Sequence, residues 1–243
     1  EALRAAGRRD EAKSVLERIV AQFGTRKPKE RALVHFELGR LAIAEQNRTL
    51  ALKELETASK IDPTHGGVLQ LLGEIAAEEG QLLRAQRTYR GLLLVLKGQK
   101  AGTQQTVFLR ERPVSKAGVL VELAHLAERQ KEADRKEEYL ESAFEAVLQE
   151  PDEHEPLVRA LRRRGYVDLV GRAVEARLQN AELSDGERTK LELELASQKL
   201  GEGDAPSDEV RAEVLGLALA AFARAPFDTR IREQASTIAR RAG

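Results

Sequence analysis

Three residue types are missing from this chain of 243 residues: cysteine, methionine and tryptophan. Without cysteine there are no disulfides and no thiolate chemistry, and the redox compartment stays open. Without methionine there is no initiator residue, and the helical pattern that begins at Glu1 predicts a piece of a longer protein. Aromatic residues make up only 4% of the chain, so the apolar fraction of 42% consists mostly of alanine, leucine and valine. This composition is typical of closely packed helices.

Long apolar runs and net charge are also absent. No run approaches the roughly 18 apolar residues of a membrane-spanning helix, and no signal peptide is visible. We therefore expect no membrane insertion and a cytoplasmic location, with a periplasmic one as the alternative. The 40 basic residues balance the 40 acidic ones, so net charge favours neither nucleic acid nor an acidic membrane as a partner. The excess of arginine, 28 residues against 12 lysines, indicates a bacterial source.

Signatures of catalysis are missing as well. The chain has no Gly-x-Ser-x-Gly elbow, no phosphate-binding glycine loop and no His-Glu-x-x-His motif. Glu122 and His125 form half of a di-iron signature, but the sequence holds no second such pair. The sequence thus predicts a protein that is not an enzyme and has no cofactor, no metal and no small-molecule substrate.

A period of 34 residues is the strongest positive signal. Four pairs of residues repeat with that period: Leu38 and Leu72, Gly39 and Gly73, Ala51 and Ala85, and Leu55 and Tyr89. Asp62-Pro63 closes the first unit, because proline cannot continue a helix. Residues 32–92 therefore resemble the tetratricopeptide repeat family, whose unit is two antiparallel helices. Lys97 stands where the second unit would have its proline.

The resemblance implies an all-α fold, an α-α superhelical solenoid of antiparallel helix pairs. We interpret residues 1–243 as one array, with clear repeats over 1–96, an insertion over 97–116 and divergent repeats over 117–243. Further helices are expected over five ranges: 155–164, 167–178, 186–200, 208–225 and 229–242. Ser184 and Glu187 predict a capping box at one of their starts. An ordinary helical bundle stays the alternative for residues 152–243.

The family binds partner segments in a concave groove lined by its first helices. The resemblance places seven residues of this chain there: Leu33, Phe36, Arg40, Ile43, Gln70, Glu74 and Ala77. The apolar members predict a groove for an apolar or amphipathic segment of another protein. The alternative is that flanking helices cover them.

The insertion supplies a second candidate contact. Over residues 97–113 it contains an apolar segment with a basic residue at its end, Val107, Phe108, Leu109 and Arg110. Residues 84–116 hold eight basic residues and one acidic residue, whereas 117–156 hold twelve acidic and four basic ones. We expect a non-catalytic protein–protein interaction scaffold. A nucleic-acid-binding array using the basic 84–116 block is one alternative, disfavoured by the few aromatic residues available for base stacking. A regulatory segment of a larger enzyme or signalling protein is the other.

Overall fold

The computed structural model describes residues 8–98, 114–180, 183–201 and 207–243. Within these stretches every regular element is a helix, which confirms the predicted all-α fold. The chain forms two compact units, residues 1–139 and 140–243, and the boundary between them falls inside helix α8 (Ala133–Gln149). No described helix is long and apolar enough to cross a membrane.

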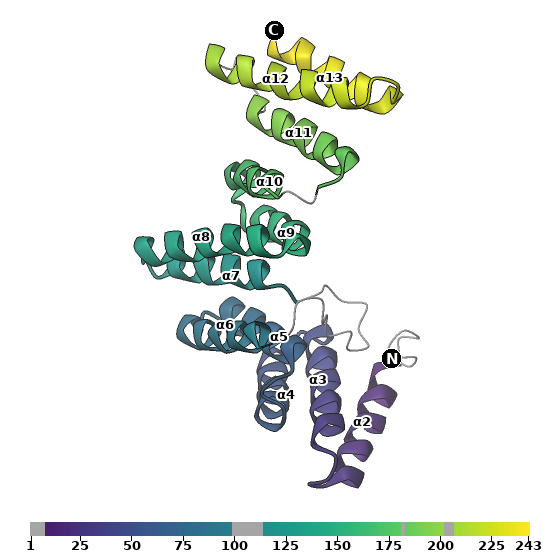
Figure 1. Cartoon of the computed structure of the whole chain (residues 1–243). Coiled ribbons are helices and arrows are strands. Elements are labelled where there is room, and N and C mark those ends of the chain that lie inside the picture. Colours follow the sequence, from purple (N-terminus) through teal and green to yellow (C-terminus); the bar gives the residue numbers. More distant parts are fainter. Residues whose placement is uncertain (1–7, 99–113, 181–182, 202–206) are drawn as a thin grey trace. The chain divides into compact units, whose positions relative to one another are not determined.

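The first unit is a succession of helices, and from its first described helix to the one before α8 each contacts the next along the chain. Helices α3 (Pro28–Ala44) and α4 (Arg48–Ile61) pack side by side (Figure 1), and so do α5 (Gly66–Glu78) and α6 (Leu82–Lys97). Such contacts between sequence neighbours define a solenoid. Before α8, the helices of this unit are α2 (Arg9–Phe23), α3 (Pro28–Ala44), α4 (Arg48–Ile61), α5 (Gly66–Glu78), α6 (Leu82–Lys97) and α7 (Lys116–Arg129).

Small residues let the two helices of a pair approach closely. A Cβ atom built on Gly39 of α3 would lie 2.9 Å from Cγ of Leu55 on α4, closer than real Cβ contacts come. Leu55, Ala51 and Ala58 are completely buried on the facing side of α4. The repeated glycine and alanine positions therefore lie where the two helices of this pair pack against each other.

Side chains cap three helices of the first unit at their N-termini. The side chains of Asn47, His65 and Ser115 accept hydrogen bonds from backbone N–H groups in the first turns of α4, α5 and α7. These bonds satisfy donors that a helix leaves unpaired at its start. They fix where these three helices begin, and so which of their side chains share a face.

The second unit continues the helical pattern. After the end of α8 it contains η1 (Pro151–Glu153), α9 (His154–Arg164), η2 (Val167–Leu169), α10 (Val170–Leu178), α11 (Asp185–Leu200), α12 (Asp208–Arg224) and α13 (Thr229–Ala242). The capping box is confirmed at α11, where Ser184 and Glu187 each bond the other's backbone N–H group.

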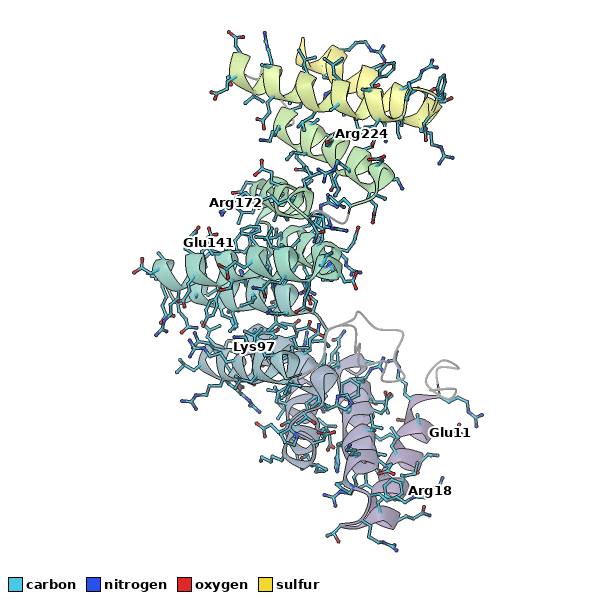
Figure 2. The ribbon with its side chains drawn as sticks, viewed as in Figure 1. Glu11, Arg18, Lys97, Glu141, Arg172 and Arg224 are labelled. Carbon is cyan, nitrogen blue, oxygen red and sulfur yellow. The ribbon has the colours of Figure 1, made fainter. Side chains whose placement is uncertain are left out.

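Charged side chains tie helices of the second unit together. The guanidinium of Arg172 on α10 donates to Glu141 on α8 at 2.7 Å and lies 4.5 Å from the ring centroid of Phe144. Arg224 on α12 pairs with the buried carboxylate of Glu192 on α11. Figure 2 labels Arg172, Glu141 and Arg224 on their helices.

Candidate binding face of α3 and α5

One face of α3 carries three partly exposed side chains, those of Leu33, Glu37 and Arg40. Steps of four and three residues place them one above another on the helix. The guanidinium of Arg40 donates to the Glu37 carboxylate at 3.0 Å. Only 9% of the Arg40 side chain is exposed, so the ion pair is held against the protein surface and does not extend into solvent.

Phe36, predicted to contact a partner, is placed in the core instead. It is 2% exposed and belongs to a hydrophobic cluster that includes Leu69 and Leu72 of α5. Its ring centroid lies 5.4 Å from that of His65, and the Arg40 guanidinium lies 5.8 Å from the ring. Phe36 therefore helps to hold the Arg40 side chain in place, since a guanidinium over an aromatic ring is a favourable cation–π contact.

His65 links this core to the start of α5. Its Nδ1 accepts the Val68 N–H at 3.1 Å, which requires that nitrogen to be unprotonated. Burial lowers the pKa of His65, against the attraction of nearby Asp62. The ring is therefore neutral at neutral pH, as its capping role needs.

Most of the remaining predicted residues stay partly accessible. Ile43 packs against the same hydrophobic cluster but is not fully buried. On α5, the Gln70 amide donates to the Glu74 carboxylate at 3.2 Å, and both side chains are partly exposed. Of the seven helical residues predicted to line the groove, two are thus buried, Phe36 and Ala77.

The same repeat positions are partly exposed in both helix pairs. Offset by 34 residues, they form three pairs: Leu33 and Gly67, Glu37 and Leu71, and Arg40 and Glu74. Glu37, Gly67 and Leu71 were not among the predicted site residues. The signal that could have found them is the 34-residue period itself, together with the four-residue step from Leu33 to Glu37. We call these six positions, with Ile43 and Gln70, the α3/α5 face.

A separate hollow lies among α2, α3 and α4. It has a volume of about 350 Å³, with Leu38, Leu41 and Ala42 of α3 on its apolar walls. At its edge, the imidazole Nδ1 of His35 and a carboxylate oxygen of Glu54 lie 2.8 Å apart. Both lysine and glutamate side chains line the hollow, so its charge favours neither an anionic nor a cationic ligand.

The predicted contact residues of the insertion cannot be placed on the structure. Val107, Phe108, Leu109 and Arg110 fall outside the described stretches, so their role stays a prediction. Within the described stretches, no three histidine, aspartate or glutamate side chains group as metal ligands would.

Comparison with known proteins gives likenesses of fold only. No family model matches the chain, and no curated protein matches it. Among solved structures, YrrB, a TPR protein with an unusual peptide-binding site, is 12% identical, and the match covers 91% of this chain and 97% of YrrB with a TM-score of 0.41.

Two further solved structures give similar values. PilW, a widely conserved type IV pilus biogenesis factor, is 11% identical over 96% of this chain and 93% of its own, with a TM-score of 0.44. A thermophilic TPR protein of Thermus thermophilus is 20% identical over 85% of this chain and 98% of its own, with a TM-score of 0.41. By its own repeated helix pairs, this chain is an all-α protein of solenoid type that resembles the tetratricopeptide repeat proteins, most clearly over residues 32–92.

Proposed function

We propose that this chain is a non-catalytic scaffold that binds a segment of another protein on the α3/α5 face. The observation that supports this most directly is the repetition of partly exposed residues at matching positions of two successive helix pairs. Such a face offers an extended partner accessible contacts at regular intervals, which is how repeat proteins form long binding surfaces.

The chemistry of the face indicates what kind of segment fits. Leu33, Ile43 and Leu71 supply apolar contact, whereas Arg40 and Glu74 place opposite charges at the same position of successive repeats. A segment with apolar residues flanked by charges of both signs would match this pattern. The salt dependence of its binding should be modest, because exposed ion pairs contribute only about 0–1 kcal/mol each.

The experiment is an affinity measurement with the partner that co-purifies with the protein from its own cells. Replacing Leu33 or Leu71 by glutamine should weaken binding about tenfold each, since burial of one leucine contributes roughly 1.5–3 kcal/mol. Lys60→Gln on α4 is the matched control, because Lys60 is exposed outside the α3/α5 face. Equal affinities for all three variants would exclude the face as the contact.

A second contact within the same function is the 97–113 insertion. Replacing residues 99–111 by a short glycine-serine linker should preserve the helix content, because the entropy cost of closing a loop changes only slowly with its length. We expect the replacement to weaken or abolish partner binding. If the whole array melts instead, the insertion is a structural strap and has no binding role.

The nucleic-acid alternative predicts a different salt response. A helical array that neutralises phosphates with the basic 84–116 block would lose affinity steeply as salt rises. Titrating single-stranded RNA or DNA into the intact chain at two salt concentrations separates the two functions. Tight binding with a steep salt dependence, flattened by the 99–111 replacement, would favour nucleic acid and count against the scaffold.

A further inference from the structure

Helix α6 exposes a row of five residues, two leucines and three cations. They are Leu83, Arg87, Arg90, Leu94 and Lys97. Steps of four, three, four and three residues put all of them on one face of the helix. No other residue of α6 is exposed. We call this row the α6 outer face, and Figure 2 labels Lys97, its last member.

The two leucines are unusually open to solvent. Leu83 is 65% exposed and Leu94 is 71% exposed, whereas Leu92 of the same helix is completely buried. Eleven residues separate them, or about 16 Å along a helix with a rise of 1.5 Å per residue. The outer face therefore presents two apolar contacts three turns apart, with Arg87 and Arg90 between them.

The charge of the helix has one sign. Arg84, Arg87, Arg90 and Lys97 are its four charged residues, and it contains no aspartate or glutamate. Arg84 pairs with Glu56 of α4. Arg90 donates to the hydroxyl of Tyr139, a neutral group, so this bond does not compensate the charge of Arg90. Neither Arg87 nor Lys97 has an ion pair among the described residues. The outer face is thus basic where it is exposed.

The preceding repeat carries polar residues at the corresponding positions. At positions offset by 34 residues, α4 has Thr49 for Leu83, Lys53 for Arg87, Glu56 for Arg90 and Lys60 for Leu94. The α4 row is polar throughout and has a carboxylate among its cations. The α6 row differs by two leucines and by the loss of that carboxylate, and both changes favour an acidic, partly apolar partner.

We propose that the α6 outer face docks an acidic amphipathic helix of a partner protein. Two apolar side chains of that helix, about three turns apart, would cover Leu83 and Leu94, and carboxylates between them would face Arg87 and Arg90. This surface lies on the second helix of its pair, and none of its residues belongs to the α3/α5 face, so we expect the two faces to bind independently.

Two other classes of partner fit less well. A membrane surface favours a continuous apolar stripe that sinks into the lipid, but here two arginines interrupt it. Single-stranded nucleic acid needs aromatic platforms for its bases, and none of the five exposed residues is aromatic. An acidic helix uses both the leucines and the cations.

The test uses the intact chain and a synthetic helical peptide as the probe. The peptide is alanine-based, carries two leucines eleven residues apart on one face, and has two glutamates between them on that face. We expect it to bind, and binding to weaken about tenfold for Leu83→Gln or Leu94→Gln, since each leucine buries roughly a full side chain. Arg87→Gln should weaken binding about two- to fivefold, in the range of an exposed ion pair.

Matched controls separate the α6 outer face from general attraction. Lys60→Gln, at the α4 position corresponding to Leu94, should leave peptide affinity unchanged, and so should Leu33→Gln on the α3/α5 face. A peptide with its two leucines moved to opposite faces should bind at least tenfold more weakly. Circular dichroism of each variant checks that α6 still folds.

Three results would overturn the proposal. One is a peptide that fails to bind, and another is binding that Leu83→Gln and Leu94→Gln leave intact. The third is preference for another probe: stronger binding of phosphatidylserine vesicles or of single-stranded RNA than of the peptide, abolished by the same variants, would assign the surface to a membrane or to nucleic acid. Loss of function at the α3/α5 face would not affect these measurements.

Discussion

Gly73 of α5 lies against the ring of Tyr89 on α6, so closely that a Cβ atom on residue 73 would come within 2.7 Å of the ring carbon Cε1. Tyr89 is completely buried. The contact repeats that of Gly39 with Leu55 one unit earlier, at the same two repeat positions but with a larger partner. The glycine and the large residue opposite it thus set how closely the two helices of a pair approach.

The first prediction follows from this contact. Gly73→Ala should lower the free energy of unfolding by about 1–3 kcal/mol, because the added methyl group overpacks against a buried ring. Gly91→Ala is the matched control, since a Cβ atom at that helical position meets nothing within 4 Å. There the change should raise stability by about 0.5–1 kcal/mol through helix propensity alone. Denaturant melts of both variants decide it, and equal effects would contradict the packing account.

The second prediction concerns Phe36. Phe36→Ala should cost about 3–5 kcal/mol of stability, as truncation of a buried aromatic side chain does. Leu33→Gln, three residues away on the partly exposed row, should change stability by less than about 1 kcal/mol. Thermal melts followed by circular dichroism compare the two. If the Phe36→Ala chain melts at the same temperature as the parent chain, Phe36 is not a core residue, and the sequence-based prediction that it lines the groove would be favoured.

The third prediction concerns acid stability. Well above about pH 6.5, the ordinary pKa of histidine, the His65 ring is neutral in the folded and the unfolded chain alike. As the pH falls below that value, the unfolded chain binds a proton first, because burial lowers the pKa of His65 in the folded state. The free energy of unfolding should therefore fall with pH until the lowered pKa is passed. His65→Asn keeps a capping side chain without a titrating group.

The measurement for that variant is stability against pH. Between about pH 7.5 and pH 5.5, the His65→Asn chain should lose less stability than the parent. Part of the loss should remain in the variant, because burial also lowers the pKa of His154 in the second unit. Identical slopes for the two chains would show that His65 does not titrate on unfolding.

The fourth prediction tests whether stability is local. Ser184→Ala removes one side of the capping box at α11 and should destabilise that helix by about 0.5–2 kcal/mol. In a solenoid the effect should spread mainly to neighbouring helices. Hydrogen exchange should speed up in the first turn of α11 and stay unchanged in α4 and α5. Equal acceleration at both places would indicate one cooperative fold.

The helices could be predicted from sequence because they depend on local signals. The expected helices over 155–164 and 208–225 agree with α9 and α12 to within one residue at each end. The expected helix over 167–178 divides into η2 and α10. Its first turn has the hydrogen bonding of a 3₁₀-helix, and the rest that of an α-helix. The interpretation of residues 1–243 as one array stays a prediction.

The candidate site was harder to predict, because it depends on contacts between distant residues. Phe36 is buried by His65 and by α5, and the sequence does not specify which side of α3 those residues approach. The hollow beside His35 needs three helices to form. The α6 outer face was hidden for a related reason: the helix has six leucines, and only the packed structure separates Leu83 and Leu94 from the buried Leu92.

Site-specific photo-cross-linking tests the central claim, that the α3/α5 face holds a segment of another protein, most directly. A photoreactive amino acid is placed at Leu33, at Leu71 or, as the control, at Lys60, and the chain is irradiated in its own cells. The account predicts that positions 33 and 71 cross-link to one and the same protein partner, on neighbouring residues of a single segment, and that position 60 does not. Cross-links to nucleic acid, or equal labelling from all three positions, would contradict it.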